Sequence, residues 1–74
     1  MEIRIEHGYI TLGQLLKRLD IVSSGGEVKA YLAERKVHVN GEAEQRRGRK
    51  LVPGDVLVID SQTYRLVGDE HAAP

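Results

Sequence analysis

Cysteine, tryptophan and phenylalanine are all missing from this sequence of 74 residues, and tyrosine occurs only three times. Without cysteine, the chain can form neither a disulfide scaffold nor a thiolate zinc site. The hydrophobic core must therefore come from leucine, isoleucine and valine. A chain of this length buries only about 60% of its unfolded surface, which leaves room for one domain and no deep substrate cavity.

Long apolar segments are lacking as well. No run approaches the roughly 20 apolar residues that cross a bilayer. The start of the chain, Met1 to Ile5, does not combine a basic segment with an apolar one, as a signal peptide would. We therefore expect a cytoplasmic protein with no membrane partner. One domain is expected over residues 1–68, followed by a flexible tail over residues 69–74.

The net charge is zero, with 11 basic and 11 acidic residues, which at first argues against a nucleic-acid partner. The charges are unevenly distributed, however. Between Gln14 and Lys50, nine basic residues accompany five acidic ones, giving a net charge of +4. The rest of the chain carries two basic and six acidic residues, giving −4. Such asymmetry can create a local positive field on a neutral protein.

The first third of the chain carries the signals of one strand and one helix. Apolar and polar residues alternate over residues 2–6, which is typical of a half-buried strand. Thr11 and Gln14 have the spacing of a helix capping box. Leucines then follow at helical intervals, at Leu12, Leu15, Leu16 and Leu19. This stripe predicts a helix that buries its leucines and leaves Lys17 and Arg18 outside the core.

Segment Ser23–Gly26 interrupts the helical pattern and precedes a second predicted helix. Ser24 is the expected N-cap, and Glu27 has the position that completes another capping box. A helix N-terminus offers free N–H groups to phosphate, and the two glycines would allow a phosphate to approach closely. An ordinary interhelical turn is the alternative, because the Glu27 carboxylate would compete for the same donors. Lys29, one turn further on, favours the phosphate interpretation.

The second half of the chain has the pattern of short strands joined by turns. Strands are expected over residues 37–39, 56–59 and 63–67, with turns at residues 40–41, 53–55 and 60–62. The intervening stretch, residues 42–50, is polar and is expected to be a loop. The predicted fold class is therefore α+β, with two short helices packed on a small, mainly antiparallel sheet.

Four cations lie within five residues in the segment Arg46–Lys50, which we call the basic loop. Arginine and lysine neutralise phosphates, and arginine also binds phosphate oxygens in a forked geometry or stacks on bases. Gly48 would allow the backbone to bend so that neighbouring cations converge. A solvated surface loop is the alternative interpretation, because short basic segments are common.

Residues that would support catalysis or metal binding are few. None of the three histidines has metal-ligand spacing to another, so we expect neither a metal nor another cofactor. No nucleophile elbow surrounds the Ser23-Ser24 pair, so we do not expect an enzyme. Tyr31 falls on the apolar face of the second helix. Tyr9 and Tyr64 are left open as surfaces on which bases could stack.

The order of these elements resembles a known family. The pattern V-x-V-N-G at residues 37–41, then the basic loop, then Pro53-Gly54-Asp55, resembles the alpha-L RNA-binding motif named for the S-four ribosomal protein. The likeness covers about residues 10–60. Three segments resemble more closely the small stand-alone YaaA-like proteins of this S-four-like family: Ile10–Gln14, Ser24–Gly26 and Arg46–Leu51.

The resemblance implies RNA contacts from the first helix, the start of the second helix and the loop after V-x-V-N-G. Many family members have arginine directly after the serine that opens the second helix, where this chain has Gly25-Gly26. More of the RNA contact would therefore fall on the basic loop. The predicted RNA-binding residues are Lys17, Arg18, Ser24, Gly25, Gly26, Lys29, Arg46, Arg47, Arg49 and Lys50.

The resemblance further implies a non-catalytic bacterial protein that binds structured RNA as a monomer. Ribosomal RNA of the large subunit, or its precursor, is the expected partner, with a role in ribosome assembly or on the ribosome. A protein-interaction adaptor that presents the basic loop to an acidic partner is the alternative. Strong salt dependence of RNA binding would separate the two.

Overall fold

The computed structural model describes residues 1–6 and 8–68, so the predicted tail over residues 69–74 lies outside the described residues. The secondary-structure elements in chain order are β1 (Glu2–Ile5), β2 (Ile10–Thr11), α1 (Leu12–Arg18), α2 (Gly25–Glu34), β3 (Val37–Val39), β4 (Glu42–Glu44), β5 (Lys50–Leu51), β6 (Val56–Ile59) and β7 (Gln62–Gly68).

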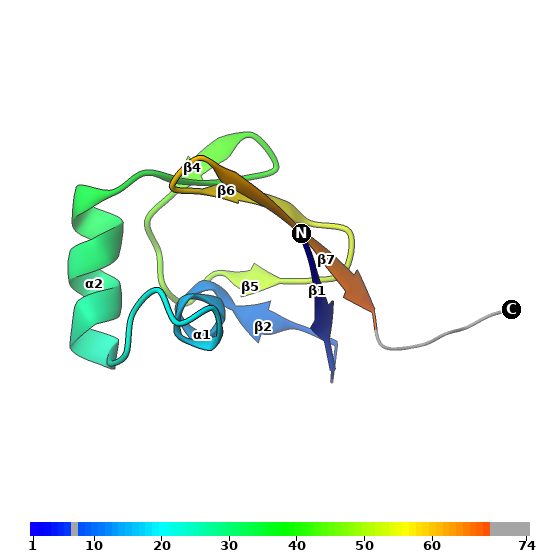
Figure 1. Cartoon of the computed structure of the whole chain (residues 1–74), viewed down its shortest axis with the longest axis horizontal. Coiled ribbons are helices and arrows are strands. Elements are labelled where there is room, and N and C mark those ends of the chain that lie inside the picture. Colours follow the sequence, from blue (N-terminus) through cyan, green and yellow to red (C-terminus); the bar gives the residue numbers. More distant parts are fainter. Residues whose placement is uncertain (7, 69–74) are drawn as a thin grey trace, which may run out of the picture.

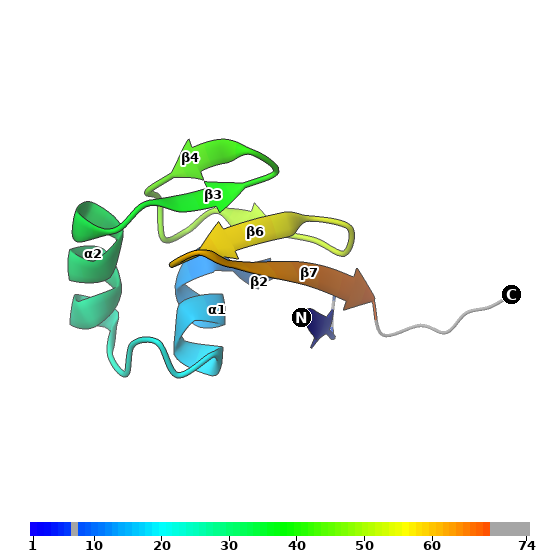
Figure 2. The same ribbon diagram turned by 45° about the horizontal axis from the view of Figure 1, so that its top comes forward.

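Five strands form one sheet in the order β1-β7-β6-β3-β4, and β2 and β5 form a separate two-stranded ribbon. Helix α1 and the β2–β5 ribbon lie on one side of the sheet, while α2 stands at one end of the molecule (Figure 1). Figure 2 shows β4, β3, β6 and β7 side by side above α1. All pairs are antiparallel except β1 with β7, which is parallel. The prediction of two helices on a mainly antiparallel sheet is thus confirmed.

Three short strands were not expected from the sequence. Strand β4 pairs with β3 directly after the tight turn, although Glu42-Ala43-Glu44 has no β-branched or aromatic residue. Strand β2 pairs with β5 through Ile10 opposite Leu51. Pairing partners and packing override weak local preferences in such short strands. No helix within residues 1–6 and 8–68 is long and apolar enough to cross a membrane.

The core lies between the sheet and α1, and the leucine stripe enters it as predicted. Leu12, Leu15 and Leu16 are fully buried. Leu19 is only partly buried, because α1 ends at Arg18 and Leu19 is its C-cap. Strands β1, β3, β6 and β7 of the sheet contribute alternate residues, a pattern that follows from the two-residue period of a strand. These residues are Ile3, Ile5, Val37, Val39, Leu57, Ile59, Tyr64 and Leu66.

The two helices begin in different ways. In α1 the predicted capping box is complete: Gln14 N–H donates to Thr11 Oγ1 at 3.2 Å, and Thr11 N–H donates to Gln14 Oε1 at 3.0 Å. In α2, Ser24 Oγ accepts from Glu27 N–H at 3.3 Å, which confirms the N-cap. The Glu27 carboxylate instead accepts from Ser23, so the predicted second capping box is only half formed.

The two sequence motifs of the resemblance are joined by side-chain hydrogen bonds. Asn40 Nδ2 donates to Asp55 Oδ1 at 3.0 Å, and Asn40 Oδ1 accepts from Val56 N–H at 2.9 Å. Asp55 Oδ2 in turn accepts from Val52 N–H at 3.0 Å. Asn40 has a φ of +53°, which asparagine tolerates better than most residues. The V-N-G turn and the P-G-D turn therefore form one connected corner of the sheet.

The buried stripe makes a direct prediction about stability. Leu16→Ala should lower the free energy of unfolding by about 2–5 kcal/mol, the range for truncating a buried leucine. Lys17→Ala, one residue on and exposed, is the matched control and should change it little. Chemical denaturation of both variants checks this, and equal losses would contradict the helix orientation described here.

Candidate nucleic-acid interface

The basic loop is held by one buried carboxylate at the edge of the sheet. Glu44, the last residue of β4, is only 6% exposed and lies opposite Val37 of β3. Arg46 donates to it from its backbone N–H and Nε at 3.0 Å each and from Nη2 at 3.2 Å. Arg49 Nη1 donates to it at 2.7 Å. These bonds bend the loop back over the end of β4.

The pKa of the Glu44 carboxyl is lowered far below its ordinary value. Hydrogen bonds from the Arg46 side chain are the largest cause, followed by those from the Arg46 backbone and the Arg49 side chain. Burial opposes this shift but is outweighed. Glu44 is therefore ionised at neutral pH, and part of the positive charge of Arg46 and Arg49 is compensated inside the protein.

The other side of the basic loop is fixed to the start of α1. Leu12 N–H donates to the Arg49 carbonyl and Gly13 N–H donates to the Arg47 carbonyl, both at 2.9 Å. A Cβ on Gly13 would lie 3.4 Å from this Arg47 oxygen and from Val28 Cγ1. A Cβ at position 13 would therefore be in van der Waals contact with the backbone of the basic loop. Figure 1 shows the segment between β4 and β5 running past α2 to the start of α1.

Three separate segments meet at an open groove of about 300 Å³. Lys17 comes from α1, Gly25 from the start of α2, and Arg47 and Gly48 from the basic loop. We call this hollow the three-segment groove; its remaining lining residues are Thr11, Gly13, Gln14 and Val28. The structure thus brings together one part of each segment that the sequence assigned to RNA.

The remaining predicted residues are divided around this groove. Lys29 lines a neighbouring hollow together with Arg47, so Arg47 lies between the two. Lys50 lines a third hollow with Arg46 and Arg49. Arg18, the last residue of α1, is exposed but is not among the residues that line the three-segment groove. The four cations of the basic loop are therefore not equivalent, contrary to their appearance in the sequence.

Within residues 1–6 and 8–68, the N–H groups of Gly25 and Gly26 at the start of α2 have no hydrogen-bond acceptor. The Glu27 carboxylate accepts from Ser23 N–H at 2.6 Å and from Ser23 Oγ at 2.7 Å, outside the helix. These bonds lower the pKa of Glu27. A Cβ on Gly25 or Gly26 would meet no atom within 4 Å. Internal packing therefore does not require glycine at either position, whereas close approach of a ligand to the backbone would.

The α1 N-terminus differs in this respect. Its first donors, Leu12 N–H and Gly13 N–H, are occupied by carbonyls of the basic loop, and Gln14 N–H is occupied by Thr11. Since a helix N-terminus attracts anions through such donors, only α2 keeps this capacity on the side of the groove. The same helix carries the two glycines, Gly25 and Gly26, that the sequence predicted to allow close approach of a phosphate.

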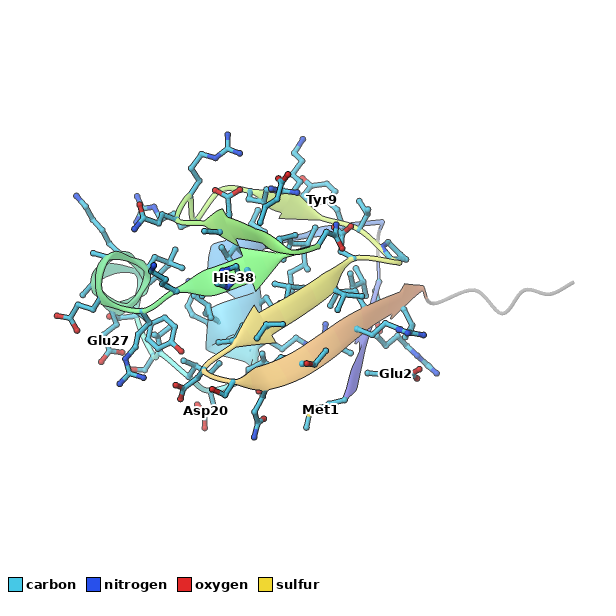
Figure 3. All side chains as sticks on the ribbon, turned by 90° about the horizontal axis from the view of Figure 1, so that it is seen from above. Met1, Glu2, Tyr9, Asp20, Glu27 and His38 are labelled. Atoms are coloured by element: carbon cyan, nitrogen blue, oxygen red, sulfur yellow. The ribbon has the colours of Figure 1, made fainter. Side chains whose placement is uncertain are left out.

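The three tyrosines have different environments. Tyr64 is only 8% exposed and belongs to the core. Tyr31 is partly buried, lies 5.7 Å from the Arg35 guanidinium and has a pKa raised mainly by burial. Tyr9 keeps 48% of its surface exposed. Figure 3 shows it on the side of the molecule away from Met1 and Asp20.

Comparison with known proteins places this architecture in a family. The sequence profile of the S4 domain matches residues 3–67. The chain belongs to the S4-domain family. This S4-domain protein is 52% identical over 58 residues to the probable ribosome maturation protein RlbA of Bacillus subtilis, a stretch covering 78% of the chain and 82% of the relative.

A second relative is much longer. The chain is 35% identical over 52 residues to the small ribosomal subunit protein uS4m of Schizosaccharomyces pombe, which covers 70% of the chain. The match spans only 16% of that relative. The likeness to uS4m therefore concerns one part of a larger protein.

The residue that organises the site, Glu44, was not among the site residues predicted from the sequence. Glu44 was counted there only as one acid among five, although it stands two and five residues before Arg46 and Arg49. That close spacing of one acid and two arginines was the available signal. The spacing could not predict that Glu44 is buried, because residues 42–44 were expected to belong to a loop and not to a strand.

The Glu44 ion pairs predict a pH-dependent stability. Glu44→Gln should lower the free energy of unfolding by about 1.5–3 kcal/mol at pH 7, because it removes charged hydrogen bonds. Because the pKa of folded Glu44 lies below its unfolded value, this contribution is complete above about pH 4.3 and is lost as the pH falls further. The difference between wild type and Glu44→Gln should therefore shrink below pH 4.3.

Denaturation curves at pH 7, 4 and 3 measure this difference. Glu42→Gln, on the same strand and exposed, is the matched control and should change the stability little at pH 7. A Glu44→Gln penalty that stayed constant down to pH 3 would show that the ionised carboxylate does not stabilise the loop.

Proposed function

We propose that this S4-domain protein binds structured RNA through the three-segment groove and the basic loop, and that it is not an enzyme. The observation that supports this most is the meeting of Lys17, Gly25 and Arg47 at one hollow from three separate segments. Among the described residues, no carboxylate forms an ion pair with Lys17, Lys29 or Arg47. Their charges are free to neutralise phosphates.

In this proposal α1, α2 and the basic loop act as an alpha-L RNA-binding motif. Double-stranded RNA is recognised mostly by its shape and its phosphates. Arg47 and Lys17 contact phosphates across the groove, and the N–H groups of Gly25 and Gly26 donate hydrogen bonds to one phosphate at the start of α2. Ser24 holds the helix start in position, while Arg18, Lys29 and Lys50 extend the contact outward.

Arg46 and Arg49 have a double role in the proposal. Their hydrogen bonds to Glu44 leave the Arg46 side chain 77% exposed and that of Arg49 29% exposed. Arg46 can therefore contact a phosphate with its outer edge while it remains bonded to Glu44. Arg49 contributes chiefly by fixing the loop.

The RNA that we propose is ribosomal RNA of the large subunit or its precursor. The similarity to a probable ribosome maturation protein over most of both chains supports a ribosomal context. The absence of a row of exposed aromatic residues among those described disfavours an extended single strand. The protein would act as a monomer in the bacterial cytoplasm, where ribosomal particles are assembled.

The central position of Arg47 predicts a loss of affinity without a loss of stability. Arg47→Gln should weaken binding to a structured ribosomal RNA fragment by about tenfold, whereas Arg65→Gln, on β7, should not. Both variants should melt as the wild type does, because Arg47 contacts α1 through its backbone carbonyl. If about four phosphates are neutralised, the logarithm of affinity should fall with the logarithm of salt at a slope of roughly −3 to −4.

Titrations at several salt concentrations test both points, and Arg47→Gln should reduce the slope by about one. Equal affinities of the Arg47 and Arg65 variants would contradict the proposed contact surface. Tighter binding to a single-stranded oligonucleotide of equal length would contradict the preference for folded RNA.

The proposed ribosomal target makes a separate prediction in cells. On sucrose gradients the protein should travel with large-subunit particles at low salt and leave them at high salt, because few phosphate contacts hold it. Arg47→Gln should be shifted toward the top of the gradient and Arg65→Gln should not. Comigration with no ribosomal particle, together with salt-insensitive capture by a protein, would instead favour the adaptor.

A further inference from the structure

An exposed apolar spot lies beside the basic loop and has no role in the interface proposed so far. Tyr9 and Val52 are 48% and 45% exposed, which makes them two of the four large hydrophobic residues that the described chain leaves exposed. They directly flank the pair Ile10 and Leu51 of the antiparallel β2–β5 ribbon. Continuing that register places Tyr9 opposite Val52 at the end of the ribbon.

A cation adjoins the same spot. Lys50 Nζ lies 5.0 Å from the centroid of the Tyr9 ring. The ammonium group does not cover the ring, since Tyr9 remains half exposed. Lys50 also lines a hollow with Arg46, Gly48 and Arg49, so the ring stands at the border of the basic loop. A flat apolar surface next to a positive charge matches the two parts of a nucleotide, a base and its phosphate.

We propose that Tyr9 is a stacking site for one unpaired base of the bound RNA, with Lys50 on the phosphate beside that base. This rests on the proposed function, since it requires that RNA occupies the basic loop. Tyr64 is buried in the core and Tyr31 is partly buried beside Arg35, so neither adds a second exposed ring beside Tyr9. The target is therefore a double helix interrupted by a bulge or junction, rather than an extended strand.

The site predicts a preference between two RNA hairpins that differ by one nucleotide. One probe is a fully paired stem, and the other is the same stem with a single bulged 2-aminopurine. The wild type should bind the bulged hairpin about 5- to 150-fold more tightly, which corresponds to 1–3 kcal/mol for stacking one base. Binding should also change the fluorescence of the bulged 2-aminopurine.

Tyr9→Ala should remove this preference while leaving affinity for the paired stem unchanged. Tyr9→Phe should retain the preference, because stacking needs the ring and not the hydroxyl. Val58→Ala, which truncates an exposed apolar residue on β6, should retain it as well. Melting temperatures of all three variants should be close to that of the wild type.

The outcomes separate this inference from the proposed function. Binding of both hairpins by the wild type with equal affinity, or an unchanged preference in Tyr9→Ala, would overturn the stacking site and leave RNA binding intact. Binding of neither hairpin at low salt would overturn both proposals. A preference lost in Tyr9→Ala and kept in Tyr9→Phe, with an altered 2-aminopurine signal, is the expected result.

Discussion

Four hydrogen bonds from Arg46 and Arg49 converge on the carboxylate of Glu44, and the position of the basic loop depends on them. A buried carboxylate is costly unless it is paired and hydrogen-bonded. Here that requirement constrains the chain that follows β4, because the two arginines must stay close to the sheet edge. The loop is then in place to offer its carbonyls to the first donors of α1. A carboxylate on the sheet and the N-terminus of a helix are thereby connected through one short segment.

This arrangement divides the cations of the segment by task. Two arginines compensate one acid, which leaves a modest local excess of charge around Glu44. Arg47 and, on the helices, Lys17 and Lys29 are among the cations that form no ion pair within the described residues. A neutral protein can thus present a localised positive surface. Arg46 and Arg49 are paired with Glu44 inside the fold, whereas Lys17 and Arg47 keep their charges at the three-segment groove.

Much of the fold could be predicted from local patterns. The Thr11–Gln14 cap and the leucine stripe depend on residues within two turns of each other, and both were found correctly. Strands β3, β6 and β7 were found because β-branched alternation ends in recognisable turns. The short strand β4 was missed, since its pairing depends on β3 and not on its own composition. The division of the basic loop was missed for the same reason: which arginine meets Glu44 is decided by the bend of the backbone in three dimensions.

The parallel pairing of β1 with β7 has a consequence for the order in which the molecule can form. The other pairs of the five-stranded sheet, β3–β4, β3–β6 and β6–β7, join strands of the second half of the chain. The β2–β5 ribbon is separate from this sheet. Among the described strands, the first pairs with the last, with Glu2 opposite Arg65 and Ile5 opposite Gly68. Such a distant contact carries a high loop-closure entropy. Strand β1 can therefore take its place in the sheet only when β7 is available to pair with it, and this pairing closes the longest loop among the described strands.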